Sequence, residues 1–165
     1  MAIRRIEGTD DDVIVMDDTY FPVVVATWFG APSEKAVRIY FEWAREMVAR
    51  ATREGARIVN ITDAGPAKTP DAAVRRLIAD LTKALEAAGG NDEAMMSYVV
   101  VENAVIRGVM TALGWLHGNL KAHHVSTCAE ALEAGIRELA RARMPLPKGL
   151  EPAKWRRPER LPRGT

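Results

Sequence analysis

Two apolar runs separated by an amphipathic helical pattern constrain the fold of this chain most strongly. The runs are ARIVNIT at 56–62 and MMSYVVVEN at 95–103. Between them, apolar residues recur at spacings of three and four, on one face of a helix: Val74, Leu77, Ile78, Leu81 and Leu85. A strand, a helix of this length and a second strand form a right-handed crossover between parallel strands. The nearly continuous apolar character of the second run is typical of a strand covered on both faces.

The segment at 11–30 predicts an antiparallel hairpin that precedes this unit. DVIVMDD and FPVVVATWFG are dense in β-branched residues and are joined through the turn-like DDTYFP. Pro22 lacks an amide hydrogen, so we expect it at the start of the second strand or at a sheet edge. A helix follows, with Ser33 as its N-cap and Gly55 at its end.

Three further elements follow the second apolar run. The pattern predicts a helix from Ala104 to Gly118, a short strand within KAHHVST, and a helix from about Ala129 to Arg143. The order is then ββαβαβαβα. We expect a single α/β domain over residues 1–143 with a five-stranded mixed sheet and four main helices. In that sheet the N-terminal antiparallel hairpin is followed by mostly parallel strands.

Composition and charge narrow the class of protein. A chain of 165 residues is long enough for one domain with a genuine core. Its formal net charge of +1 provides no overall field that would attract nucleic acid. Cys128 is the only cysteine, which excludes an intrachain disulfide, and no run approaches the roughly 20 apolar residues of a membrane span. We therefore expect a cytoplasmic protein with no integral membrane segment and no nucleic-acid partner.

From Met144 the sequence changes to a Pro-rich basic tail, residues 144–165. A continuous helix is excluded there by prolines, at Pro145, Pro147, Pro152, Pro158 and Pro162. We expect an extended segment that either wraps the domain or stays mobile, with Trp155 as the residue that attaches it. The tail is also basic, with Arg156 and Arg157 at its centre. We interpret this charge as a solvated tail rather than a contact with nucleic acid or lipid.

Over about residues 10–142 the chain resembles the STAS/SpoIIAA-like domains in two respects. These are the order of its elements and the hydrophobic patterns of RIVNITDAG, MSYVVVENAVIRGVMTALGWL and AEALEAGIREL. These small bacterial cytoplasmic domains are related in fold to anti-sigma-factor antagonists and to Sec14-like lipid-binding domains. The resemblance implies a regulatory or protein-interaction module. In phosphorylatable antagonists a serine in an Asp-Ser-Ser-Gly motif begins the helix after the central strand. The corresponding positions here are Lys68, Thr69, Pro70 and Asp71, so the acid before the acceptor is a lysine and the glycine after it is missing.

The loop after the first apolar run contains the candidate site residues Asp63, Lys68 and Thr69. Thr69 is followed by proline and an acid, which predicts that its hydroxyl caps the next helix. A regulated hydroxyl is the alternative, since a phosphate at a helix N-terminus would be electrostatically favourable. Asp63 lies at the carboxyl end of a central strand, where ligands bind in open α/β sheets. It can pair with Lys68 or serve only to solvate the loop.

The remaining polar candidates predict no catalytic or metal site. His123 and His124 are adjacent in a strand and point to opposite faces, so they cannot chelate one metal together. We interpret Cys128 as a buried, inert thiol. The chain has no phosphate-binding loop, no nucleophile elbow and no zinc-protease motif. We therefore expect no enzyme activity, no cofactor and no metal.

Apolar residues outside the main helical stripes suggest an interface. Ile39 and Trp43 lie away from the inner face of the first helix, and Trp115 lies opposite the stripe of the helix at 104–118. Either the chain itself covers these faces, or they contact a second copy or another protein. We predict a homodimer and a non-enzymatic regulatory or protein-interaction module. The alternative is a carrier or sensor of a small apolar ligand or lipid, in a pocket lined by Met47, Met96 and Met110.

Overall fold

The computed structural model describes residues 3–9, 12–91, 93–104 and 122–160. Its strands are β1 (Ile3–Thr9), β2 (Asp12–Asp17), β3 (Val23–Phe29), β4 (Ile58–Asp63), β5 (Met95–Val100) and β6 (His123–Val125). Its helices are α1 (Glu34–Glu54), α2 (Ala72–Ala87) and α4 (Cys128–Arg141), with a short 3-10 helix η1 (Pro152–Lys154) in the tail. None of these described helices is both long enough and apolar enough to span a membrane.

The strands form one mixed sheet whose spatial order, β1-β2-β3-β4-β5-β6, is also their order in the chain. β1 and β2 pair antiparallel, as do β2 and β3, and the remaining neighbours pair parallel. The α/β class, the hairpin and the parallel crossovers are therefore confirmed.

Within the described residues the sheet has six strands rather than five, because β1 adds an edge strand that the sequence pattern did not predict. Its sequence, IRRIEGT, contains charged residues and a glycine and lacks the alternating apolar pattern of a half-buried strand. Backbone pairing with β2, from Ile3 opposite Asp17 to Thr9 opposite Asp12, defines it instead.

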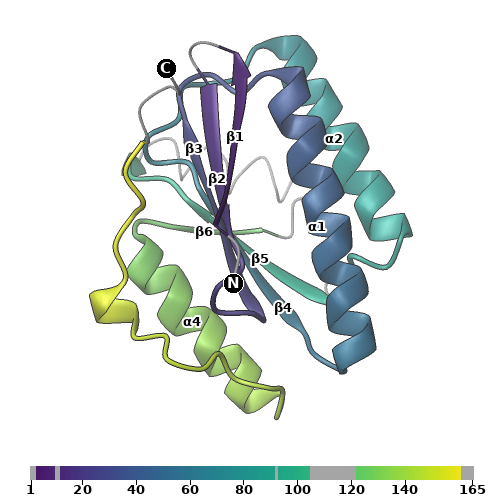
Figure 1. Cartoon of the computed structure of the whole chain (residues 1–165), viewed down its shortest axis with the longest axis vertical. Coiled ribbons are helices and arrows are strands. Elements are labelled where there is room, and N and C mark those ends of the chain that lie inside the picture. The colour runs from purple at the N-terminus through teal and green to yellow at the C-terminus, as the bar shows by residue number, and fades with distance from the viewer. Residues whose placement is uncertain (1–2, 10–11, 92, 105–121, 161–165) are drawn as a thin grey trace.

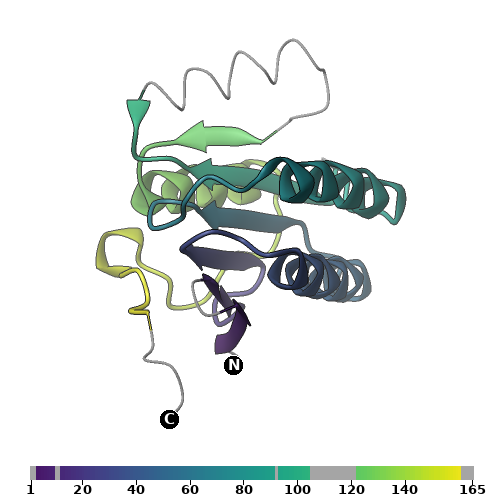
Figure 2. The same cartoon turned by 90° about the horizontal axis from the view of Figure 1, so that it is seen from above.

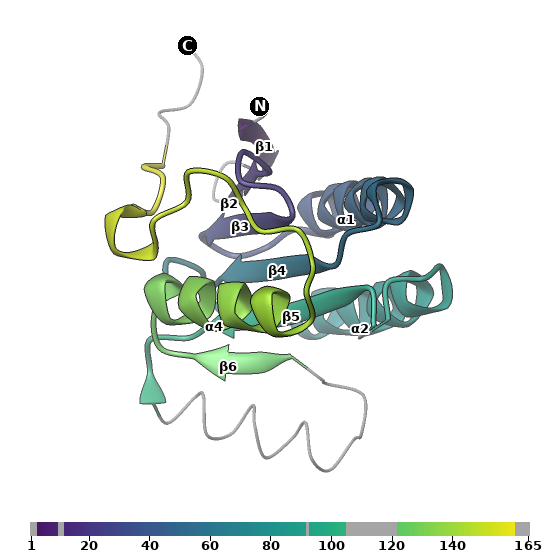
Figure 3. The same ribbon diagram turned by 90° about the horizontal axis from the view of Figure 1, so that it is seen from below.

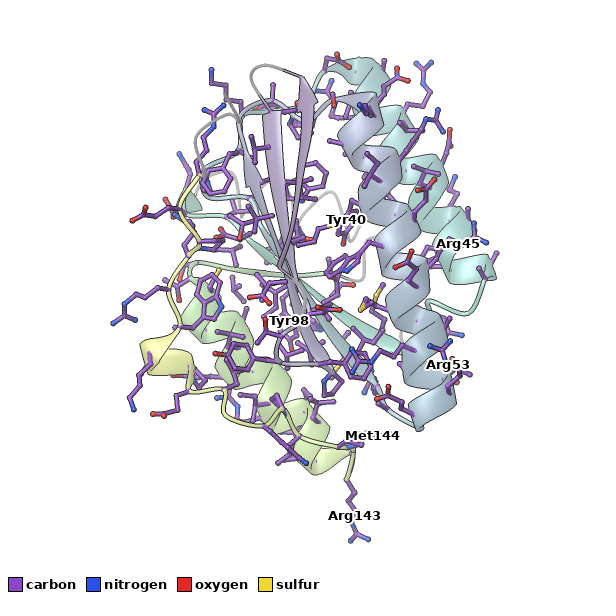
Figure 4. All side chains as sticks on the ribbon, in the orientation of Figure 1. Tyr40, Arg45, Arg53, Tyr98, Arg143 and Met144 are labelled. Carbon is purple, nitrogen blue, oxygen red and sulfur yellow. The ribbon has the colours of Figure 1, made fainter. Side chains whose placement is uncertain are left out.

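Helices cover both faces of the sheet. Figure 3 shows α1 and α2 on one side and α4 with the tail on the other. In β4, Ile58 belongs to the core beneath α1 and α2, whereas Val59 and Ile61 belong to the core beneath α4. This alternation follows the pleat of a strand. Tyr40 on α1 and Tyr98 on β5 mark the two cores in Figure 4. β4 is thus buried on both faces. In β5, for which we expected the same, Met96, Tyr98 and Val100 are buried in the core beneath α4, whereas Met95, Ser97 and Val99 on the other face are only half-buried.

The helix ends follow the predicted capping chemistry in α1. The Ser33 hydroxyl accepts a hydrogen bond from the amide of Ala36, and Gly55 ends the helix in the left-handed conformation with φ of 63°. α4 begins at Cys128, one residue before the predicted start, because the Thr127 hydroxyl caps it. The predicted helix at 104–118, which carries Trp115, lies outside the described residues beyond Ala104.

The α1 surface that we expected to form an interface is covered by the chain itself. Trp43 is only 2% exposed and belongs to the core beneath α1 and α2, where its ring lies 6.2 Å from that of Tyr40. Ile39 is partly buried against the same core. α2 lies alongside α1, as Figure 2 shows, and contributes Val74 and Leu85 to this core. The assignment of Trp43 to an intermolecular interface is therefore wrong, since a second helix of the chain covers its face.

The tail wraps the domain over its described part, residues 144–160. Met144, Leu150 and Trp155 pack against the core beneath α4. Figure 1 shows this segment running back along α4 toward the carboxyl ends of the central strands. Of the two alternatives for the tail, the wrapped one is confirmed, and Trp155 is one of its attachment points. Most basic residues of this segment are exposed, as expected for a solvated charge, but Arg157 pairs with Asp63 of the domain.

Candidate functional site

Four side chains from different parts of the chain meet at the carboxyl edge of the parallel strands. Asp63 is the last residue of β4, and Glu102 follows the end of β5. Cys128 is the first residue of α4, and Arg157 lies in the tail. This edge is where open α/β sheets bind ligands, because the loops after parallel strands diverge there. We refer to Asp63, Glu102, Cys128 and Arg157 as the edge cluster.

A bidentate ion pair between Arg157 and Asp63 forms the centre of the edge cluster. Arg157 Nε donates to Asp63 Oδ2 at 2.6 Å, and Arg157 Nη2 donates to Asp63 Oδ1 at 2.9 Å. The Asp63 side chain is fully buried at 0% exposure, whereas that of Arg157 is 35% exposed. These hydrogen bonds are the main reason that the pKa of Arg157 is raised above its ordinary value. Neither alternative considered for Asp63, pairing with Lys68 or solvation of the loop, describes this arrangement, because the tail supplies its cation.

The other two members of the edge cluster complete the environment of this pair. Arg157 Nη2 also donates to Glu102 Oε1 at 2.8 Å, so the guanidinium bridges two carboxylates. Cys128 is 7% exposed, as expected for a buried thiol. Burial and the neighbouring Asp63 carboxylate, to which the thiol hydrogen-bonds, raise the pKa of Cys128 far above its ordinary value. The thiol is therefore protonated near neutral pH.

Gly65 provides the room that the guanidinium needs. Its amide donates to Asp63 Oδ1 at 3.1 Å, which turns the chain immediately after β4. A Cβ atom on Gly65 would collide with Arg157 Nη2 and would lie 2.6 Å from Glu102 Oε1. The absence of a side chain at this position therefore lets Arg157 lie directly against the loop.

The loop between β4 and α2 is held in place by backbone hydrogen bonds to both neighbouring strands. Ala64 N donates to Val100 O at 3.2 Å at the end of β5. On the other side, Gly30 N donates to Pro66 O at 3.3 Å, and Lys68 N donates to Gly30 O at 2.8 Å. The side chain of Lys68 and the whole of Thr69 are exposed at the far end of this loop. The backbone of the loop is thus fixed as far as Lys68, while Lys68 and Thr69 are exposed.

Thr69 does not cap the following helix. Asp71 is the N-cap of α2, and its carboxylate accepts a hydrogen bond from Val74 N at 2.8 Å. Aspartate ranks above threonine at this position, and the helix begins two residues later than we expected. Pro70 consequently lies outside the helix, where its carbonyl accepts a hydrogen bond from Arg75 Nη1 at 2.9 Å.

An open depression of about 340 Å³ adjoins the edge cluster. Its lining combines the start of α4 with the tail: Glu102, Ser126, Thr127, Cys128, Ala129, Trp155, Arg156 and Arg157. Glu102 remains 58% exposed here, so one carboxylate of the edge cluster faces solvent. The charged residues of the lining are therefore Glu102 after β5 and the two arginines of the tail, which forms much of the wall.

The apolar ligand pocket that we considered as an alternative is not formed by the expected methionines. Met47 belongs to the core beneath α1 and α2, and Met96 belongs to the core beneath α4. They lie on opposite faces of the sheet, so they cannot line one cavity. Met110 lies outside the described residues.

Sequence reasoning found Asp63 and the attachment by Trp155 but missed the partners of Asp63. Arg157 is 94 residues away from Asp63 in the chain and was interpreted as one of several solvated basic residues of the tail. Glu102 directly follows an apolar strand and carried no motif. The one sequence signal for Arg157 as a partner was its position two residues after a tryptophan, in a segment otherwise dominated by prolines.

Together, fold and site define a mixed α/β domain whose own C-terminal segment completes the carboxyl edge of its sheet. Comparison of the chain with protein-family models and with curated proteins gives no match.

Proposed function

We propose that the protein is a non-enzymatic regulatory or protein-interaction module of the STAS/SpoIIAA-like type, which recognises its partner through the loop at 64–71. One observation carries this proposal: the backbone of the loop is fixed by hydrogen bonds, yet the loop presents exposed residues. Its backbone is hydrogen-bonded to the ends of β3 and β5, while Lys68 and Thr69 are exposed. A loop that is already ordered loses little conformational entropy on binding, which favours recognition.

The chemistry of the edge cluster supports a binding role over a catalytic one. A general base or nucleophile needs a reactive atom that is available to substrate in the right protonation state. Here both oxygens of Asp63 accept hydrogen bonds from Arg157, and the carboxylate is fully buried. The Cys128 thiol is buried and its pKa is raised, so thiolate is scarce near neutral pH. These groups act on one another and stabilise the edge of the sheet.

The proposed partner is a different protein rather than a second copy of this chain. The homodimer prediction depended on Trp43, which is a core residue, on Ile39, which is partly buried against the same core, and on Trp115, which lies outside the described residues. The loop at 64–71 is independent of both. Its exposed residues also occupy the positions that the family resemblance associates with regulation, namely the end of the loop before the helix.

Affinity capture from the source cell with matched charge variants tests this proposal. Lys68→Glu reverses the charge at the loop tip, and Lys83→Glu makes the same change at an exposed position of α2 away from the loop. We expect one partner to be captured by the parent chain and by Lys83→Glu, and at least tenfold less by Lys68→Glu, since opposed charges at an interface are unfavourable. Equal capture by all three chains, or the absence of a stoichiometric partner, would contradict the proposal.

A further inference from the structure

We propose that residues 155–157 of the tail occupy, within the same chain, a docking site for an extended protein segment that carries an arginine two residues after an aromatic residue. The tail is then an intramolecular competitor of the partner. This inference rests on the proposed function and specifies the chemistry that the partner presents at the base of the same loop.

The acidic half of this docking site is built for a guanidinium. The two oxygens of Asp63 receive the two parallel N–H groups of Arg157, at 2.6 and 2.9 Å. Only an arginine offers such a planar fork, whereas the ammonium of lysine is a point charge. Glu102 accepts a further hydrogen bond from the same Nη2, and the missing side chain of Gly65 leaves room for the guanidinium against the loop. The site therefore selects arginine over lysine.

The apolar half accepts an aromatic side chain. Trp155 is partly buried against the core beneath α4 and forms one wall of the open depression. Between the two anchors, Arg156 is exposed, and its described hydrogen bonds run from Nη1 to the nearby carbonyls of Ala153 and Trp155. The recognition pattern is thus an aromatic residue, an arbitrary residue and an arginine.

The described tail is attached in a way that permits release without unfolding. The backbone hydrogen bonds around η1 are local, from Lys154 and Trp155 back to Glu151 and Pro152. The ion pair between Lys154 and Glu151 is local as well. The described contacts that join this segment to the domain include the packing of Met144, Leu150 and Trp155 and the hydrogen bonds of Arg157 to Asp63 and Glu102. Detachment therefore breaks neither the sheet nor a domain helix.

Exchange of the tail for a competing segment is favoured over detachment of the tail alone, because the Asp63 side chain is fully buried. If the tail detaches and nothing replaces it, the Asp63 carboxylate stays buried without a cation, which costs free energy. A competing arginine removes this penalty. The covalent link gives the tail an effective concentration on the order of millimolar, so a free segment competes poorly unless the tail is weakened.

The test uses the full-length chain with Arg157→Ala and a fluorescent peptide of residues 150–160, LEPAKWRRPER. We expect fluorescence anisotropy to give at least tenfold tighter binding of this peptide to Arg157→Ala than to the parent chain. A peptide in which Arg157 is replaced by alanine should lose binding at least tenfold. A peptide in which Arg156 is replaced should bind like the parent peptide, because Arg156 is outside the ion pair.

A second chain variant, Arg157→Lys, keeps a cation over Asp63 and guards against loss of folding. The peptide should raise the melting temperature of both variants, since a ligand that binds only the folded state stabilises it. No binding and no shift in either variant would overturn the inference, as would equal losses from the two peptide substitutions. If either of these peptide results is found while partner capture still depends on Lys68, only this inference fails. If the capture also fails, the proposed function fails with it.

Discussion

Removal of the Arg157 side chain should destabilise the domain more than removal of its partner charge, although the two form one ion pair. Loss of one member of a buried pair typically costs about 3–5 kcal/mol, because the other charge stays buried and unpaired. The Arg157 side chain is 35% exposed, so water partly replaces it, and we expect about 2–3 kcal/mol for Arg157→Ala. Asp63→Asn leaves a guanidinium that can turn to solvent, and should cost about 1–2 kcal/mol.

A double-mutant cycle isolates the pair itself. In the Asp63→Asn background no buried charge remains to be orphaned, so Arg157→Ala should there cost only about 1 kcal/mol, for lost packing and the contact with Glu102. The difference, a coupling free energy of about 1–2 kcal/mol, is measured from urea unfolding curves of the four chains.

Arg156→Ala is the matched control for this cycle. Arg156 is the neighbouring exposed arginine, and surface substitutions usually change stability by no more than about 0.5 kcal/mol. If Arg157→Ala is as mild as Arg156→Ala, or if the effects in the double variant simply add, the ion pair does not hold the tail and the reasoning is refuted.

Four further outcomes follow from the same structure. Gly65→Ala places a methyl group against Arg157 and Glu102, and should lower the free energy of unfolding by about 1–3 kcal/mol in thermal melts. Trp43→Ala empties a core site and should cost about 3–5 kcal/mol in urea unfolding, with no change in mass by light scattering. Alkylation of Cys128 by iodoacetamide at about pH 8 should be at least tenfold slower in the native chain than in the unfolded chain, because burial and Asp63 raise the pKa of Cys128. Burial lowers the pKa of His124 below its ordinary value of 6.5, so the folded chain binds fewer protons than the unfolded chain and stability falls as pH drops through about 6.5. His124→Gln should flatten that dependence between about pH 7 and pH 5 in urea unfolding.

Each of these expectations has an outcome that contradicts it. A neutral Gly65→Ala would mean that the ends of the Arg157 and Glu102 side chains move aside at no cost, so that their ion pair does not hold them against the loop. A stable Trp43→Ala chain with an altered mass would restore the interface interpretation of α1. Stoichiometric labelling of native Cys128 within the mixing time would show an accessible thiolate. An unchanged pH profile in His124→Gln would place the titrating group elsewhere.

Periodicity and capping residues predicted the central fold because they report on burial and on local hydrogen bonding. The patterns of β4 and β5 show apolar side chains on both faces, and Ser33 and Gly55 mark the ends of α1. β1 escaped prediction because backbone pairing with β2, rather than an apolar pattern, makes it a strand. The start of α2 was misplaced because Thr69 and Asp71 are both competent caps, and only the path of the loop decides between them.

The candidate site was predicted only in part, because its two halves are joined by tertiary structure. Asp63 could be found from its position at the end of a central strand. Its partner Arg157 could not, since no local pattern links residues 94 positions apart. Trp43 shows the same limit, because its angular position on α1 did not reveal that α2 packs beside it.

The Arg157 guanidinium offers the most direct test of the claim that the tail completes the edge of the sheet. In ¹H–¹⁵N spectra of the full-length chain, the Arg157 Nε–H should be protected from solvent exchange and shifted downfield by its 2.6 Å hydrogen bond to Asp63. This signal should collapse to ordinary values in Asp63→Asn, while the signal of Arg156 stays unchanged. An Arg157 Nε–H that exchanges as fast as that of Arg156 in the parent chain would contradict the claim.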